Sequence, residues 1–170
     1  MNKILAISCY LLFPLLVSAQ VLPPEGWRFP DESDYADDWI EYRETYPVPF
    51  HAQGDFNGDG LTDDAWILIS KTGDFGGLCV FLAENNAPPK IIWLDKATMV
   101  YKPQWVGISA VPPGKYETAC GKGYFACQSE EPKELDLPFP ALNFMYFGKA
   151  NIFFWWNKIS KKFDTTPMSD

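Results

Sequence analysis

Short apolar runs separated by turn-forming residues recur along the chain from residue 50 onward. Each run has the length of a strand, and the intervening segments are rich in Gly, Pro, Asn and Asp, which favour turns. This spacing predicts a mainly antiparallel sheet. The predicted strands cover residues 65–70, 78–83, 90–94, 105–110, 116–119, 141–147 and 151–157.

A different periodicity precedes these runs. Tyr35, Trp39 and Tyr42 are spaced to lie on one face of a helix, with Ser33 or Asp31 as its N-cap. Prolines before and after this segment limit the helix to a few turns. The sequence therefore predicts an α+β fold, a mainly antiparallel β sheet with one short N-terminal helix.

The first residues have the pattern of a secretory signal peptide. Lys3 provides a basic start, residues 4–17 are mostly apolar, and Val17 and Ala19 suit cleavage before Gln20. An uncleaved membrane anchor is the alternative, but the apolar stretch is short and Pro14 interrupts it. We expect residues 1–19 to be removed and residues 20–170 to form a single mainly-β domain, periplasmic or secreted.

Composition limits the partners of such a domain. The chain has 170 residues, of which 47% are hydrophobic and 21% charged, which is typical of a folded domain rather than a disordered one. With 14 basic and 22 acidic residues, its formal net charge is −8. This acidity argues against binding of nucleic acid and anionic membrane surfaces, which require cationic side chains. No stable membrane insertion is expected after signal cleavage.

Export also bears on the cysteines. Cys79, Cys120 and Cys127 remain after cleavage, and an oxidising compartment favours a disulfide. Three pairings are open, of which Cys120–Cys127 is the most local, because it closes a short loop containing glycines. Cys79 lies in an apolar run and is expected to be a small buried residue. Zinc is disfavoured because the chain has a single histidine, His51.

One acidic segment, residues 55–63, has the composition of a cation-binding loop. Oxygen-bearing side chains occupy alternate positions at Asp55, Asn57 and Asp59, and Asp63 follows. Calcium is bound by six to eight oxygens from a tightly curled backbone, and Gly60 permits a sharp turn. The alternative is an Asx-rich turn without metal, since Asn-Gly and Asp-Gly form turns by themselves.

This segment, followed by Ala65, resembles the calcium-binding loop of FG-GAP/VCBS-type repeats and is similar to the loops of EF-hands and dockerins. The resemblance implies that calcium is bound by the side chains of four residues and by one backbone carbonyl. The side-chain ligands would be Asp55, Asn57, Asp59 and Asp63, and the carbonyl that of Leu61.

The segment also departs from the EF-hand pattern. Trp66 stands at the twelfth position, where an EF-hand has a bidentate glutamate, and no helix is readable before the loop. A loop joining two strands is therefore expected, with a further oxygen from Asp64, Asp74 or water. The C-terminal third, with Cys120 and Cys127, resembles small exported proteobacterial proteins, which implies a periplasmic address.

These observations favour a binding protein over an enzyme. A catalytic triad built on His51 has no motif to support it, and the clustered carboxylates are better explained by calcium. We expect a non-enzymatic periplasmic calcium-binding module that binds a protein partner. The alternative is a periplasmic immunity or inhibitor protein that neutralises a toxin or hydrolase attacking the cell envelope. The aromatic run 153–156 is either a strand covered on both faces or a binding surface.

Overall fold

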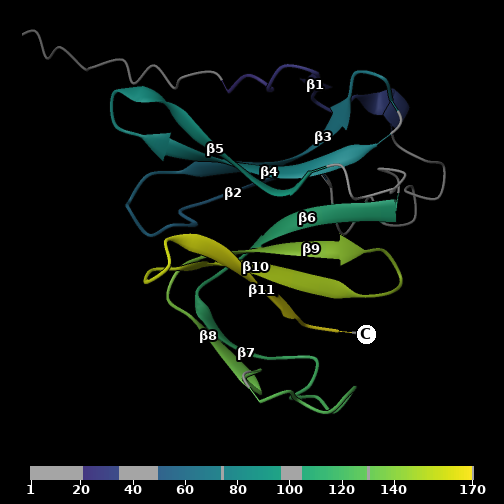
Figure 1. Ribbon diagram of the computed structural model, residues 1–170, viewed down its shortest axis with the longest axis vertical. Helices are drawn as coiled ribbons and strands as arrows, with labels where there is room; N and C mark the ends of the chain where they lie inside the picture. The colour runs from purple at the N-terminus through teal and green to yellow at the C-terminus, as the bar shows by residue number, and fades with distance from the viewer. Residues whose placement is uncertain (1–20, 35–49, 74, 97–104, 130, 170) are drawn as a thin grey trace, which may run out of the picture.

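Three antiparallel sheets are stacked as successive layers in the computed structural model of the protein (Figure 1). The structure describes residues 21–34, 50–73, 75–96, 105–129 and 131–169. The predicted signal peptide, residues 1–19, lies outside the described residues. No helix in the described ranges is long and apolar enough to cross a membrane.

The first sheet has five strands. β3 pairs with β4 along one edge, and its other edge is shared by β1 and β2, while β5 pairs with the far side of β4. Asn86, with a φ of 59°, forms the tight turn between β4 and β5. The strands are β1 (Trp27–Arg28), β2 (His51–Gly54), β3 (Asp63–Ser70), β4 (Gly76–Glu84) and β5 (Ala87–Lys96).

The second sheet has four strands in the order β11-β10-β9-β6, and the third sheet is the two-stranded β7-β8 pair. Six of the seven strands predicted from the apolar runs are confirmed, and the seventh, predicted at 116–119, begins and ends two residues earlier, at 114–117. The second sheet contains β6 (Val106–Val111), β9 (Ala141–Tyr146), β10 (Asn151–Asn157) and β11 (Lys162–Pro167), and the third contains β7 (Gly114–Glu117) and β8 (Glu134–Leu137).

The main hydrophobic core lies between the first and second sheets. Alternate residues of β3 and β4 meet alternate residues of β6, β9 and β10, so each sheet contributes one face. Ring contacts add to this packing, with Phe144 edge-to-face against Tyr146 and Phe154. The buried members include Phe56, Ile67, Leu78, Val80, Ile108, Leu142, Phe144 and Phe154.

The aromatic run of β10 is covered on both faces. Phe154 belongs to the main core, whereas its neighbour Phe153 packs with Leu135 and Leu137 of β8 in a second core on the opposite side. Phe153 and Phe154 are only 6% and 8% exposed. The run is thus explained by the position of β10 between two layers, and it is not an exposed binding surface.

The outer face of the first sheet is also covered. Trp27 of β1 lies against Trp93 of β5, with ring centroids 4.6 Å apart. Cys79 is fully buried in this third cluster, as expected for a small apolar residue. Burial raises the pKa of its thiol to about 12, so the thiol is kept uncharged.

The predicted α+β class is wrong, because the described residues are nearly all β. Their helical part is limited to 3-10 conformation, in the turn Glu32–Asp34 and at Trp105. Arg28 holds this turn through two hydrogen bonds to Asp34, of 2.6 and 2.7 Å, and the Asp34 carboxylate also accepts the N–H of Asp31. These local bonds close the turn on itself. The segment carrying Tyr35, Trp39 and Tyr42 lies outside the described residues.

Candidate metal centre

The acidic segment forms the loop between β2 and β3, as its sequence predicts. Gly54 at the end of β2 is paired with Asp63 at the start of β3, so the loop begins and ends at the same point of the sheet. Residues 55–62 curl outward from this point and return. The strand pair therefore fixes both ends of the candidate site.

Side-chain oxygens of the loop bind its own backbone amides. Asp59 N donates to Asp55 Oδ1 and to Asn57 Oδ1, each at 3.0 Å, and Gly60 N donates to Asp55 Oδ2 at 2.9 Å. Leu61 N donates to Asp59 Oδ1 at 2.8 Å, and the Asn57 amide donates to Asp59 Oδ2 at the same distance. Three predicted side-chain ligands are thus brought together around one turn.

Two glycines allow the loop to curl so tightly. Gly58 and Gly60 have φ values of 72° and 88°, in a region that side chains with a Cβ rarely adopt. At Gly58 a close approach adds to the requirement, because a Cβ there would lie 2.1 Å from Cε1 of Phe139. The loop is therefore packed against the connection between β8 and β9, a contact that sequence reasoning missed.

Asp63, the last predicted side-chain ligand, lies beneath the loop and is fully buried. Its Oδ2 accepts the N–H of Phe56 and its Oδ1 accepts the N–H of Ala83, both at 2.9 Å. Burial raises the pKa of Asp63 to about 6, although the two backbone hydrogen bonds oppose this rise. The negative charges of Asp59 and Asp55 raise the pKa further. A nearby cation would relieve this repulsion.

Asp64, one source considered for an additional oxygen, points away from the loop. Successive residues of a strand face opposite sides, so Asp63 and Asp64 are separated by β3 itself. Asp64 Oδ1 lies 2.7 Å from His51 Nε2 and accepts a hydrogen bond from Gln53. His51 also stacks on Trp66, with ring centroids 4.0 Å apart. The other source considered, Asp74, lies outside the described residues.

The arrangement suits both hypotheses drawn from the sequence. Within the described ranges, no three carboxylate, imidazole or thiol groups converge as a ready-made metal cluster. The loop is closed by its own hydrogen bonds, as in an Asx-rich turn. Each carboxylate oxygen nevertheless has a further lone pair, so it can accept an N–H and face a cation at once. The chemistry of the donors, all hard oxygens, fits calcium.

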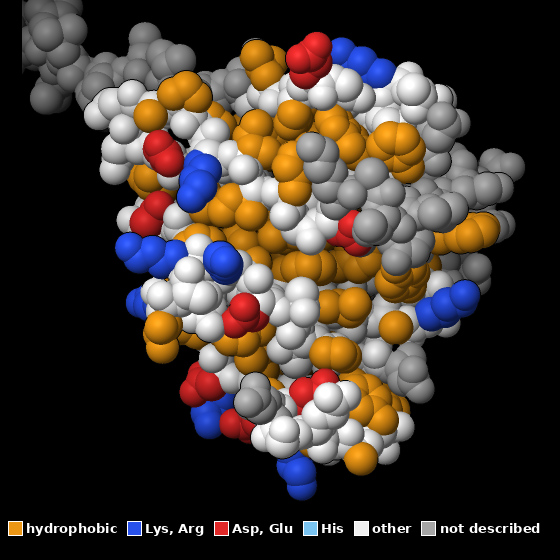
Figure 2. All heavy atoms as spheres, in the orientation of Figure 1, with side chains coloured by type: hydrophobic (Ala, Val, Ile, Leu, Met, Phe, Trp, Pro, Cys, Tyr) orange, Lys and Arg blue, Asp and Glu red, His pale blue; other side chains and the backbone are white. Residues whose placement is uncertain are grey.

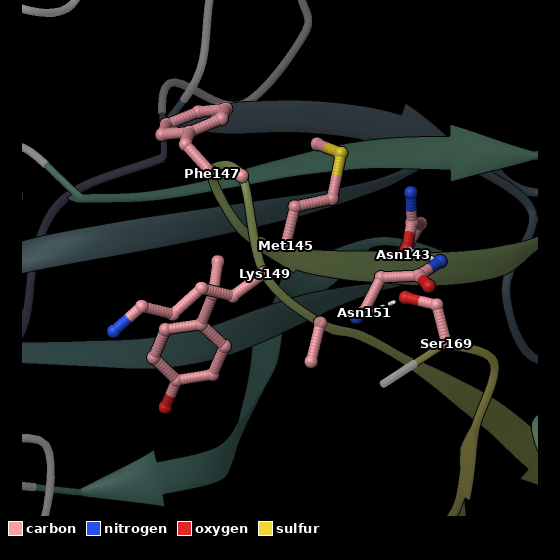
Figure 3. A pocket seen from close by; sticks show the side chains of 9 residues that line it. Asn143, Met145, Phe147, Lys149, Asn151 and Ser169 are labelled. Atoms are coloured by element: carbon pink, nitrogen blue, oxygen red, sulfur yellow. Dashed lines mark hydrogen bonds between the residues drawn. The ribbon is translucent and has the colours of Figure 1, made fainter. Parts of the chain in front are cut away.

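A separate pocket of about 260 Å³ lies beside the β9–β10 turn (Figure 3). Its polar lining includes Asn143, Asn151 and Ser169, beside Tyr146 and Lys149. The Asn151 amide donates to Asn143 Oδ1 at 2.9 Å, and Asn151 N donates to Ser169 Oγ at 3.0 Å. These groups bind one another and hold the end of the chain against β10, so they explain the polarity of the pocket.

The disulfide joins Cys120 to Cys127, the pairing favoured by the sequence. Backbone hydrogen bonds from Lys122, Gly123 and Tyr124 back to residues 118–120 tighten the enclosed loop. Closing a loop of this size covalently stabilises a fold by about 2–3 kcal/mol in the chain-entropy model. Within the loop that the disulfide closes, the side chains of Tyr124 and Phe125 are 55% and 41% exposed.

Comparison with known proteins gives no relative from which a role could be carried over. No family model, no curated protein and no solved structure matches the chain.

Proposed function

We propose that this protein is an exported, non-enzymatic module that binds calcium in the β2–β3 loop and binds a protein partner. The observation that carries the proposal is the curled loop itself. It gathers oxygens of Asp55, Asn57 and Asp59 around one turn, above the buried carboxylate of Asp63. Calcium bound there would offset the mutual repulsion of the carboxylates and fix the loop.

Calcium is expected to stabilise the native protein. At a concentration ten to a hundred times its Kd, a single site raises the free energy of unfolding by about 1.4–2.7 kcal/mol, which is about 5 °C in melting temperature for a chain of this size. Asp55→Asn with Asp59→Asn should remove this rise. The measurement is thermal unfolding with calcium and with EDTA.

Two controls make the calcium result specific. Asp31→Asn with Asp136→Asn removes the same charge from exposed positions outside the loop, so it should leave the calcium-induced rise unchanged. Magnesium prefers a smaller octahedral shell and should stabilise the protein less. An unchanged melting temperature at millimolar calcium would exclude the proposed site.

The disulfide supports an exported location, because such bonds persist in oxidising compartments. It agrees with the signal peptide predicted for residues 1–19. Both features favour the periplasm or the exterior as the place where the protein works. Calcium there reaches the concentrations that weak extracellular sites require.

The stapled loop, residues 120–127, is the surface that we assign to the protein partner. Tyr124 and Phe125 are exposed on a covalently closed turn, so little conformational freedom is lost when they are buried. Aromatic side chains are enriched in the centres of protein interfaces. A convex loop of this kind also suits the inhibitor alternative, in which it would enter the cleft of a toxin or hydrolase.

Replacement of both aromatics separates binding from folding. Tyr124→Ser with Phe125→Ser should change stability by less than about 1 kcal/mol, because both side chains are exposed. The same variant should lose a partner that wild-type protein captures from the envelope of its own cells. Leu22→Ser, at another exposed apolar position, is the matched control. Equal capture by wild type and variant would rule out the stapled loop as the contact.

A further inference from the structure

The turn between β10 and β11 combines positive charge with an exposed apolar apex. Lys158, Lys161 and Lys162 are exposed, and among the described residues none of them forms an ion pair. Ile159, between them, is 96% exposed. An almost fully exposed isoleucine surrounded by lysines without ion pairs is unexpected on an acidic protein, so this basic turn (residues 157–162) requires an explanation.

The basic turn has a fixed shape. Asn157 Oδ1 accepts the N–H groups of Ile159 and Ser160 at 2.9 and 3.2 Å, and the Asn157 carbonyl accepts the N–H of Lys161 at 2.8 Å. The Asn157 amide in turn donates to Asp164 of β11 at 2.7 Å. These bonds hold Ile159 at the apex before any partner arrives, which lowers the entropic cost of contact.

The basic turn and the β2–β3 loop meet at one aromatic ring. Lys158 Nζ lies 4.2 Å from the centre of the Phe139 ring, and Gly58 of the loop touches the same ring. The turn lies on the left side of the molecule in Figure 1, and Figure 2 shows several Lys or Arg side chains on that side. The two segments therefore form one edge, far from the stapled loop in sequence.

The composition of the basic turn favours a lipid surface over other partners. Lysine is depleted in protein–protein interfaces, where Arg and aromatic residues predominate. Nucleic acid binding to single strands uses aromatic stacking, and residues 157–162 contain no aromatic side chain. At a membrane, by contrast, an apolar side chain enters below the headgroups while flanking lysines reach the lipid phosphates.

We propose that the basic turn docks this protein onto an anionic phospholipid surface. Ile159 enters the interface, and Lys158, Lys161 and Lys162 bind the headgroup phosphates. The net charge of −8 does not prevent this contact, because at physiological ionic strength charges more than about 8 Å away are largely screened. The docking is peripheral and involves no segment that spans the bilayer.

Calcium would strengthen the docking, and this part rests on the proposed function. Asp55 and Asp59 on the neighbouring loop repel anionic lipids and offset part of the lysine charge. A divalent cation held between them cancels these two negative charges, so that the charge of the edge is set by the lysines. Affinity for anionic vesicles should then be higher with calcium than with EDTA.

The test is sedimentation of the protein, in the form processed by its own cells, with vesicles of phosphatidylglycerol and phosphatidylethanolamine. Wild-type protein should bind these vesicles and not vesicles of phosphatidylcholine, and binding should weaken with salt. Each lysine contributes about fivefold, so Lys158→Gln, Lys161→Gln and Lys162→Gln together should weaken binding about a hundredfold. Ile159→Ser alone should weaken it about tenfold.

A matched variant, Lys71→Gln with Lys133→Gln and Lys149→Gln, removes three exposed lysines elsewhere and should bind like wild type. Three results would overturn the inference: no binding to anionic vesicles at low salt, equal loss in both lysine variants, or loss only in the Tyr124→Ser, Phe125→Ser variant. A turn that binds a protein instead would give the first of these results.

The calcium proposal is judged separately, by calorimetric titration of calcium without vesicles. Vesicle binding that depends on the turn but is the same with calcium and EDTA, with no calcium uptake in the titration, would refute the calcium site and leave the docking surface. Calcium uptake without vesicle binding would refute the docking surface and leave the calcium site.

Discussion

Replacement of Asp63 by alanine is expected to lower the free energy of unfolding by about 2–4 kcal/mol, even when calcium is absent. The carboxylate accepts the N–H groups of Phe56 and Ala83, and both bonds are lost together. Each buried amide left without an acceptor costs about 1–3 kcal/mol. Burial of the Asp63 carboxylate is itself unfavourable and raises its pKa to about 6. Alanine removes this unfavourable burial, which offsets part of the loss.

The measurement is urea unfolding in EDTA, so that no cation contributes. Asp63→Asn keeps the size of the side chain but can accept only one of the two N–H groups, so its loss should be smaller than that of alanine. Asp59→Ala, in the exposed part of the loop, should cost less than about 1 kcal/mol under the same conditions. Equal stability of wild type and Asp63→Ala would show that the two backbone bonds do no more than offset the cost of burying the carboxylate.

This result separates two roles that the sequence assigned to one residue. The spacing of residues 55–63 led us to treat Asp63 only as a calcium ligand. In the structure its carboxylate also ties the loop to β4, through an amide twenty residues away. Hydrogen bonds over such a separation leave no local pattern, because they depend on the register of β3 and β4.

The strands were predictable where their residues are buried on both faces. In β4 and β10 the apolar runs are nearly continuous, since both strands lie between layers. β8 and β11 were missed for the opposite reason. Only two of the four residues of β8 are buried, and the Lys162–Pro167 strand is mostly polar, so neither stands out from a loop.

The α+β class rested on periodic aromatic positions that lie outside the described residues, and the described part of this region is a 3-10 turn. Arg28 and Asp34 form an ion pair with an Arg–carboxylate distance of 2.6 Å, which closes a 3-10 turn at the place where the helix was to begin. An ion pair over six residues is not a helical spacing, which would join residues three or four apart.

Chemistry-bearing residues of the candidate site were more predictable than their surroundings. Alternation of Asp and Asn with Gly identified the loop and its strand-to-strand position, because turn chemistry is local. Two features could not be foreseen, the ring of Phe139 beneath Gly58 and the lysines beyond it. Both come from the second sheet or its connections, and only the stacking of the sheets brings them to the loop.

Gly58→Ala is expected to cost about 3 kcal/mol of stability, about twice the effect of the same change at Gly60. Both glycines have positive φ, for which a residue with a Cβ is penalised by about 1–2 kcal/mol. Only at Gly58 does the new methyl group collide with a neighbour, 2.1 Å from Cε1 of Phe139. At Gly60 nothing lies within 4 Å of that position. Overpacking of this kind adds about 1–3 kcal/mol.

Comparison of the two variants by urea unfolding therefore isolates the contact with Phe139 from the backbone strain that they share. The decisive comparison is made in a protein that already carries Phe139→Ala, because this change removes the ring that the methyl group meets. In that protein, Gly58→Ala should cost no more than Gly60→Ala does. Persistence of the full loss without the ring would mean that the loop is not packed on Phe139. Recovery would establish the link between the β2–β3 loop and the edge that carries the basic turn, because Lys158 lies over the same ring.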